Sequence, residues 1–518
     1  MPPVRVISSL METCSEWVWR WLHRCLNHQA SPPERLRQRK YVLTTLNSNI
    51  RQKLLKRILC IHMYDVPMAS KCMLLELLAD RNTHWVDLTQ GGYAYIDEIF
   101  HLYRTLNLGL LVGLTRLGFI CNVKMKNDQK YLPDVNSTFY RLLNQMRHLQ
   151  WVRLSGVADR NMLATLGVNC HSLQHVDVSG SMRVDDMALA ALILKDPIVV
   201  EGQSQEQVAT HQLPTNSCCA TLNFVCISET QVSMMSALLL LRYVPNLTSF
   251  GGYVEAGSLS AVLQLLQPQE GVEQYKLTHL WEDRILPAQA SLLKVACPHL
   301  TTLITCESSL ASLPHLQPLT TLTLDLDFRG CASDIYSGLQ MQGDTLKELR
   351  FLKSINCPLD LAWLMELTPN LEWIECNLYI EEGYQMPTWR LLKVASVIVS
   401  SSKVVLALLT HTPELRNLSL TFLPEPYQET FECINDDLIL NTTLAGGLTR
   451  LEHLRITDCA ITMWGVQCLL LHCQQLTHIA AFSSWKNISQ HDIRTLQSQV
   501  QENNWQLNLV YHERPSKI

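Results

Sequence analysis

Leu173-Gln174-His175-Val176-Asp177-Val178-Ser179-Gly180 is the stretch that decides the fold. It begins with a leucine, which is followed by two polar residues and an apolar one. Polar and apolar residues then alternate. Successive side chains of a strand point to opposite faces, so the alternation predicts a short strand with one buried face. The next segment, Val184 to Leu189, is typical of a helix start. One strand and one helix therefore form a unit.

The same unit recurs along most of the chain. Its copies begin at Leu149, Leu222, Leu247, Leu277, Leu300, Leu319, Leu346, Leu371, Leu415, Leu451 and Leu476, with weaker copies at Trp85 and Leu114. Leu149 and Leu173 are 24 residues apart, and Leu451 and Leu476 are 25 apart. These spacings lie within the range of roughly 20–29 residues for leucine-rich repeats. The longer gap from Leu371 to Leu415 predicts an insertion or an unrecognised copy.

A stack of such units buries a continuous core that no single unit can bury alone. We therefore predict the α/β class: an irregular, curved leucine-rich-repeat solenoid with strands on the concave face and helices outside. Concave faces usually carry the contacts of solenoids, so Gln174, Asp177, Glu372 and Arg455 are weak candidates for partner binding.

Several copies place a cysteine just before the strand, as at Cys170, Cys297 and Cys473. This feature resembles the cysteine-containing class of leucine-rich repeats, which is common in substrate receptors of ubiquitin ligases. The resemblance covers about residues 85–510. It specifies a fold and leaves the partner open, because one fold serves many functions.

Two breaks in the pattern predict inserted surface loops within a repeat domain that spans residues 81–518. Residues 196–220 are polar and lack periodicity, and residues 423–437 are acidic. Both have a simple interpretation as tolerated insertions, and each can alternatively contact a partner.

The first 80 residues precede the clear repeats and are predicted to be helical. Leu10, Cys14 and Val18 follow one another at four-residue spacing, which places them on one stripe of a helix. Ser9 to Val18 resembles the BC-box, a docking helix for Elongin C. The resemblance implies that Leu10 enters a pocket on Elongin C and that Cys14 and Val18 pack beside it. Helix-in-groove recognition uses this kind of spacing.

A second motif follows the first. Leu46, Ile50 and Leu54 match the apolar positions of the cullin box, while Asn47 stands where that family has proline. Asn47 or Ser48 is also suited to cap a helix here. The two motifs ahead of the repeats look like the zyg-type receptors of Elongin–cullin ubiquitin ligases. We expect the C-terminal armadillo-type domain of those receptors to be absent.

Three other interpretations remain open, one for the N-terminal stripe and two for the whole chain. The stripe is equally consistent with an amphipathic cap that seals the first repeat. The whole chain is also consistent with a repeat scaffold that has no ligase role. An F-box-type receptor ranks lower, because the sequence lacks a convincing Leu-Pro-x-Glu start with a downstream Trp.

Composition argues against several other classes of function. The chain is 47% apolar with a net charge of −5, so it lacks the basic surplus of a nucleic-acid binder. No apolar signal-peptide core follows the N-terminus, and the longest apolar stretch, Val394 to Leu409, falls short of a membrane span. The 18 cysteines are scattered, which predicts reduced thiols and a cytosolic or nuclear protein.

The sequence also lacks recognisable catalytic and cofactor motifs. It contains no Gly-rich phosphate loop, Gly-x-Ser-x-Gly elbow or His-Glu-x-x-His helix. Cys468, His472 and Cys473 resemble a zinc half-site without a second half. We therefore expect no metal, no cofactor and no enzymatic activity. An enzyme whose site escapes motif analysis stays as the alternative from another class.

Overall fold

The computed structural model describes most of the chain. It covers residues 2–3, 17–18, 21, 32–60, 68–89, 111–120, 132–251, 258–266, 274–282, 284–325, 332–352, 357–381, 383, 385–423 and 434–511. The chain divides into two compact units. The first unit comprises Ser8–Asp283 and Leu292–Leu300, and the second comprises Met1–Ile7, Arg284–Ser291 and Thr301–Ile518.

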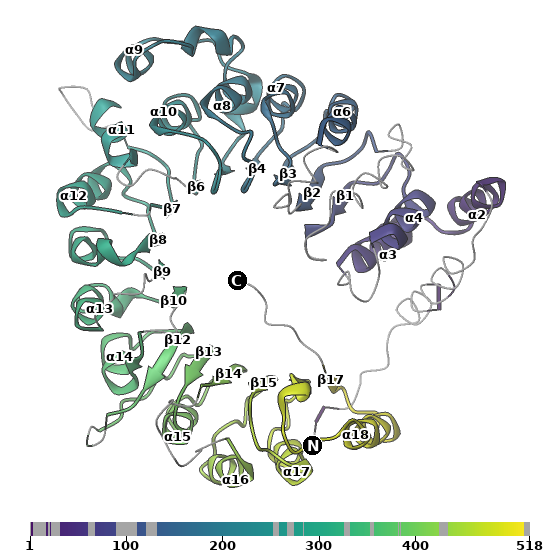
Figure 1. Cartoon of the computed structure of the whole chain (residues 1–518), viewed down its shortest axis with the longest axis vertical. Coiled ribbons are helices and arrows are strands. Elements are labelled where there is room, and N and C mark those ends of the chain that lie inside the picture. The colour runs from purple at the N-terminus through teal and green to yellow at the C-terminus, as the bar shows by residue number, and fades with distance from the viewer. Residues whose placement is uncertain are drawn as a thin grey trace. The chain divides into compact units, whose positions relative to one another are not determined.

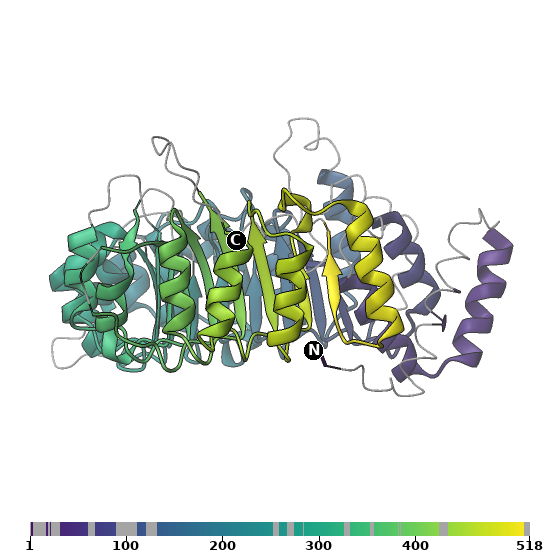
Figure 2. The same ribbon diagram turned by 90° about the horizontal axis from the view of Figure 1, so that it is seen from below.

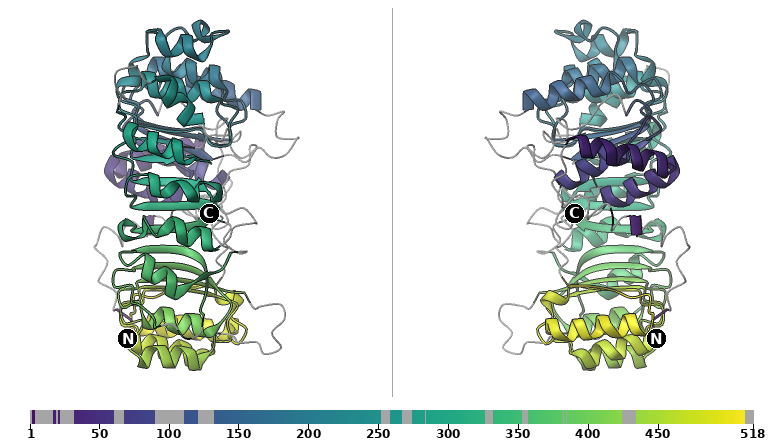
Figure 3. Two further views of the ribbon diagram at one scale, coloured as in Figure 1. Left: turned by 90° about the vertical axis from the view of Figure 1, so that its left-hand side faces the viewer. Right: turned by 90° about the vertical axis from the view of Figure 1, so that its right-hand side faces the viewer.

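From residue 32 on, the described part of the first unit consists of helices followed by a parallel strand ladder. The helices are α2 (Pro32–Thr45), α3 (Ser48–Cys60) and α4 (Met68–Leu78), drawn in purple in Figure 3, and both α2 and α3 pack on α4. Each strand then pairs in parallel with the next, in the order β1 (Trp85–Asp87), β2 (Arg116–Ile120), β3 (Trp151–Ser155), β4 (His175–Asp177), β5 (Phe224–Cys226), β6 (Ser249–Gly251) and β7 (His279–Trp281).

Helices alternate with these strands. They are α6 (Leu132–Leu143), α7 (Arg160–Asn169), α8 (Asp186–Ile193), α9 (Gln205–Thr210), α10 (Met234–Tyr243) and α11 (Ser258–Leu266). Helix α12 (Pro287–Ala296) contributes residues to both units.

The second unit repeats the arrangement. Its strands are β8 (Thr302–Cys306), β9 (Thr321–Asp325), β10 (Glu348–Leu352), β11 (Leu359–Asp360), β12 (Trp373–Tyr379), β13 (Val394–Val399), β14 (Asn417–Phe422), β15 (His453–Thr457), β16 (His478–Ala480) and β17 (Asn508–Val510). Its helices are α13 (Ala332–Leu339), α14 (Leu361–Leu367), α15 (Ser402–Thr410), α16 (Asp436–Leu444), α17 (Met463–His472) and α18 (Gln490–Glu502). Figure 2 shows the green and yellow helices side by side, with strands behind them.

Strand register aligns one buried residue from every repeat. Except in the two-residue strand β11, the second residue of each strand lies opposite the second residue of its neighbour, and from β1 to β16 these residues form the core between strands and helices. In the first unit they are Val86, Leu117, Val152, Val176, Val225, Phe250 and Leu280, and in the second Leu303, Leu322, Leu349, Ile374, Ala395, Leu418, Leu454 and Ile479. The predicted α/β repeat fold is therefore confirmed.

The turn before each strand adds a second repeated contact. The backbone N–H groups of Gln150 and Trp151 both donate to the carbonyl of Thr115, at 2.8 and 3.0 Å. The same pair of donors recurs from Gln174 and His175 to the Gln150 carbonyl. Each repeat is thus hydrogen-bonded to the one before it, which fixes the strand register.

The cysteines before the strands serve this packing. Cys170, Cys297 and Cys473 are fully buried, and Cys170 Sγ donates to the Met146 carbonyl at 3.2 Å. Burial raises the pKa of each of these thiols to about 12, so they remain protonated at neutral pH. They are small core residues, as expected from their place in the repeat.

The gap between Leu371 and Leu415 contains an unrecognised copy. Strand β13 pairs in parallel with β12 on one side and β14 on the other. Leu392 takes the leucine position and is fully buried, but Ala395 replaces the usual large residue in the second position. The small side chain concealed the copy in the sequence.

The two predicted insertions differ in structure. Residues 196–220 contain helix α9 and two 3₁₀ turns, Pro197–Val200 and Ser217–Ala220, so this segment differs from the plain loop predicted for it. Residues 424–433 of the acidic insertion lie outside the described residues. Asp436 and Asp437 fall in the first turn of α16, where Asn435 caps the helix.

The long apolar stretch is divided between a strand and a helix. Val394–Val399 forms β13, and α15 starts at Ser402. Among the described residues, every helix is too short or too polar to cross a membrane.

Candidate protein-binding face

Each strand ladder has one face that the described helices leave uncovered. Within each unit the helices lie on the outer side of the curve and the strands on the inner side (Figure 1). The second residue of each strand points toward the helices, so the first and third point to the opposite side. We call this side of each ladder the strand face.

On the first unit, the strand face carries a continuous row of stacked side chains. Register places Arg116, Trp151, His175 and Phe224 side by side at the first position of β2 to β5. The Arg116 guanidinium lies 3.8 Å from the Trp151 ring centroid. The Trp151 and His175 rings stack at 4.9 Å, and the His175 and Phe224 rings at 3.8 Å. All four side chains are half-buried, so one side of the row is accessible.

Ion pairs with carboxylates at the third strand position orient two arginines of this face. Arg116 pairs with the buried carboxylate of Asp87 at 2.9 Å, and Arg153 pairs with Asp177 at 2.8 Å. Gly118 leaves room for the first pair, because a Cβ at this position would lie 2.5 Å from Asp87 Oδ1. The arginine is therefore oriented before any partner arrives, which lowers the entropic cost of binding.

The stacked histidine is neutral at physiological pH. Burial between Trp151 and Phe224 lowers the pKa of His175 to about 4, and Asp177 opposes this shift only in part. The row thus presents one cation, Arg116, and three uncharged rings. Aromatic residues and arginine are the types that dominate binding energy in protein interfaces.

The strand face of the second unit has a different composition. Its first positions are Thr302, Thr321, Glu348, Trp373, Val394, Asn417, His453, His478 and Asn508. Arg350 lies 3.1 Å from the Trp373 ring centroid and pairs with Glu348 at 3.2 Å. Burial raises the pKa of the neighbouring Glu375, and Arg350 partly offsets the shift.

Exposed ion pairs border this second face. Glu372 pairs with Lys347 at 3.7 Å and also with Lys393, while Arg416 pairs with Glu452 at 3.3 Å. The hydrogen bond from Lys393 lowers the pKa of Glu372. Pairs of this kind are screened by salt and contribute little stability.

The predicted docking residues lie partly outside the described structure. Leu10 and Cys14 fall outside the described residues, and Val18 is half-buried in helical backbone. Leu46 and Ile50 are half-buried, whereas Leu54 is buried at 1% exposure.

The predicted helix cap is confirmed next to these residues. Asn47 precedes α3, and its Oδ1 accepts a hydrogen bond from Ile50 N at 2.9 Å. Helix α3 also packs against β1, so it covers the end of the first repeat.

The four weak candidates from the sequence have local roles. Asp177 is buried and paired with Arg153, Glu372 is paired with two lysines, and Arg455 Nη1 donates to Ser419 at 3.2 Å. Gln174 is exposed just before β4. The stacked row was missed because each copy was considered separately. Aligning the copies on their first leucine puts Arg116, Trp151, His175 and Phe224 in one column.

The described residues show no arrangement that suggests metal chemistry. No group of three or more His, Cys, Asp or Glu side chains among them is placed to hold a metal ion. Cys468 and Cys473 are buried core residues of α17 and its cap, and burial raises the pKa of both thiols.

The parallel ladders, their alternating helices and the buried cysteine turns together define an α/β repeat protein of the leucine-rich-repeat type. No protein-family model matches the sequence, and no curated protein matches it. Among solved structures, the chain is similar to one in the crystal structure of the Rad7 and Elc1 complex in yeast. The sequences are 14% identical, the TM-score is 0.44, and the match covers 88% of this chain and 95% of that one.

Proposed function

We propose that this chain binds other proteins through the strand face of its first unit and that it is not an enzyme. The stacked row of Arg116, Trp151, His175 and Phe224 carries this proposal. Its rings offer a large, rigid apolar surface that loses little conformational freedom on binding. Partners are proteins; nucleic acids and membranes are not expected to bind.

The more specific proposal is that the chain recruits substrates to an Elongin–cullin ubiquitin ligase. Its support comes from the BC-box-like stripe of Leu10, Cys14 and Val18, followed by the cullin-box-like Leu46 and Ile50. The strand face would hold the substrate while the N-terminal helices dock on Elongin C and a cullin. Ubiquitin transfer would occur on other subunits, in the cytosol or nucleus.

The burial of Leu54 restricts the second contact. Leu54 is buried together with Leu55 and Ile58 of the same helix, so a cullin would meet Ile50 in α3 and Leu46 just before it. Asn47 keeps the helix start that proline provides in the family pattern, because it caps α3 with its side chain.

Co-purification with Elongin C tests the ligase proposal. The Leu10→Asp, Cys14→Asp double variant should lose Elongin C, since carboxylates on the apolar stripe cannot enter an apolar groove without a large desolvation cost. Trp17→Asp is the matched control, because Trp17 is 63% exposed and lies beside the stripe. Circular dichroism should be the same for all three proteins.

The outcome distinguishes the ligase receptor from a plain scaffold. If the wild-type chain captures no Elongin C, the ligase role is wrong and the scaffold interpretation replaces it. If both variants lose Elongin C equally, the stripe is not the docking surface.

A further inference from the structure

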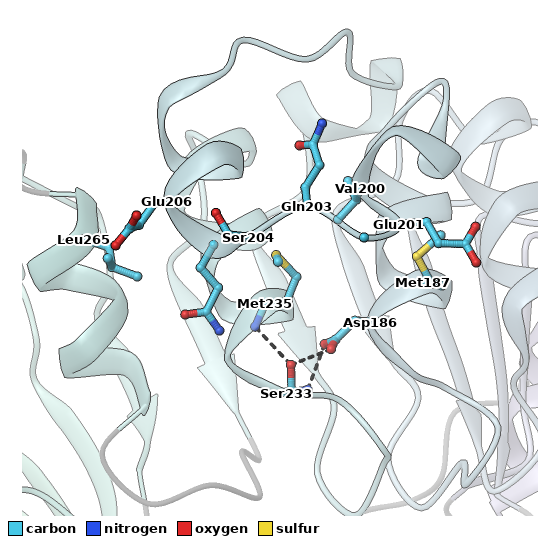
Figure 4. Close-up of a pocket in the computed structure, with 12 residues that line it drawn as sticks. Asp186, Met187, Val200, Glu201, Gln203, Ser204, Glu206, Ser233, Met235 and Leu265 are labelled. Carbon is cyan, nitrogen blue, oxygen red and sulfur yellow. Dashed lines mark hydrogen bonds between the residues drawn. The ribbon is translucent and has the colours of Figure 1, made fainter.

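A cavity of about 720 Å³ lies in the first unit beneath the inserted segment, away from the strand face. It is open to solvent and is bordered by the start of α8, by α9 with the 3₁₀ turn before it, and by α10 and α11 (Figure 4). Its volume is within the range of sites that bind small molecules or peptide side chains.

The inserted segment that forms one wall is fixed in position. Ser204 and Gln207 form a capping box at the start of α9, and Val208 is fully buried. Tyr243 of α10 donates to the His211 carbonyl at 2.7 Å. Asn216 donates to three carbonyls at the end of α8, at 2.9 to 3.2 Å. These contacts fix the middle and the C-terminal end of the segment against α8 and α10.

The floor of the cavity is apolar and adaptable. Met187, Val200, Met235 and Leu265 line it. Methionine side chains are flexible and polarisable, so they adjust to different apolar groups. The floor is thus suited to an aliphatic or aromatic side chain of a partner.

The polar groups at the base are already used by the fold. Asp186 accepts hydrogen bonds from the backbone N–H and the hydroxyl of Ser233 (Figure 4). It also accepts from the backbone N–H and the hydroxyl of Ser236, at 3.1 and 2.5 Å. This carboxylate caps α10 and has little capacity left for a ligand.

The rim of the cavity is acidic. Glu201 and Glu206 are exposed and stand on opposite sides of the opening in Figure 4. None of the described residues that line the cavity carries a positive charge. Negative potential on both sides of an apolar floor repels anionic groups and attracts flanking cations.

We propose that this cavity binds a peptide segment in which an apolar side chain is flanked on both sides by lysine or arginine. The apolar side chain would enter between Met187 and Met235, and the flanking cations would pair with Glu201 and Glu206. This site is separate from the strand face, so it does not depend on the ligase proposal. It gives the chain a second protein-binding site with its own specificity.

Selection from a phage-displayed library of random 12-residue peptides on the full chain tests the proposal. The enriched peptides should share an apolar residue flanked by Lys or Arg. Their affinities, measured by fluorescence anisotropy, should fall about three- to tenfold in the Glu201→Lys, Glu206→Lys variant, as expected for the loss of two exposed ion pairs.

Glu34→Lys with Glu502→Lys is the matched control, because it changes the net charge equally at exposed sites far along the chain. This control should retain the wild-type affinity. Met235→Glu should abolish binding by placing a charge on the apolar floor. The proposal is overturned if no peptides are enriched, if the enriched peptides lack flanking cations, or if the cavity variant and the control bind equally.

Discussion

The strand faces of the two units occupy the same positions of the same repeat yet carry different chemistry. In the first unit Arg116, Trp151, His175 and Phe224 form one stack of neighbouring side chains. In the second unit the cation–π pair of Arg350 and Trp373 is followed by Val394 at the next strand, which ends the stacking after this pair. The inward positions are aliphatic or aromatic in both units. The comparison shows that the inward positions specify the fold, while the outward positions are free to specialise.

The ion pairs of the two faces differ in the same way. On the first unit the carboxylates of Asp87 and Asp177 have side-chain exposures of 0% and 10%. On the second unit Glu372 and Lys393 are 32% and 47% exposed. A carboxylate shielded from water orients its cationic partner more firmly than a solvated carboxylate does. The first face is therefore the more rigid of the two and the better suited to present a fixed surface to a partner.

The largest expected change in stability comes from comparing a strand residue that points to the helices with its neighbour on the strand face. Phe250→Ala should lower the free energy of unfolding by about 3–4 kcal/mol, because it leaves a cavity in the core of the ladder. Ser249 is its half-buried neighbour in the strand. The Ser249→Ala substitution should change the free energy of unfolding by less than about 0.5 kcal/mol. Urea unfolding followed by circular dichroism measures both, and similar losses would contradict the assignment of the two faces.

A capping device shared by both units should give the next largest effects. Asp186 receives four hydrogen bonds at the start of α10, and Asp436 receives two from Thr462 before α17. Asp186→Ala should cost about 2 kcal/mol and Asp436→Ala about 1 kcal/mol. Thermal unfolding shows which variant loses more stability. A larger loss for Asp436→Ala than for Asp186→Ala would contradict the role assigned to these hydrogen bonds.

The stacked histidine should make the stability of the first unit depend on pH. Its folded-state pKa of about 4 lies below the ordinary value of 6.5, so the unfolded chain binds more protons between these values. Stability should therefore fall as the pH decreases from about 6.5 to about 4. His175→Phe should remove about 1 kcal/mol of this loss of unfolding free energy. The value is smaller than the full pKa shift would give, because the ring is partly exposed to solvent.

Denaturant melts at pH 7.5 and 4.5 measure this difference. His175→Gln provides the control, since it abolishes the titration while weakening the stack. It should flatten the pH profile as His175→Phe does, at a lower overall stability. An unchanged profile in both variants would show that another group is responsible.

The smallest effect is expected on the second face. Lys393→Ala removes an exposed ion pair with Glu372 and should change stability by at most about 0.5 kcal/mol, less at high salt. Melting at low and high salt concentration tests this. A loss above about 1 kcal/mol would mean that the second face is as firmly ordered as the first.

Much of the fold was predictable because burial imposes a period on the sequence. The strands starting at Trp85, His175 and Trp373 all lie within recognised copies of the repeat. Strand β13 was not recognised because Ala395 is too small to mark a core position. The short helices of residues 196–220 were missed because α9 depends on tertiary contacts, such as the one between Tyr243 and His211, which no local period encodes.

The candidate site was less predictable than the fold. A strand face is assembled from residues about two dozen positions apart, so Trp151, His175 and Phe224 give no local motif. The predicted docking residues Leu10, Cys14 and Val18, by contrast, lie close together in the sequence and form a local motif. Their role is still a prediction.

Photo-crosslinking is the most direct test of the central claim that the first strand face binds a protein. A benzoylphenylalanine replaces Trp151 on the row or, as the helix-side control, Val168 of α7, which is 60% exposed. After irradiation in cells that express the chain, position 151 should yield a discrete protein adduct and position 168 should not. No adduct at position 151, or the same adducts from both positions, would contradict the claim.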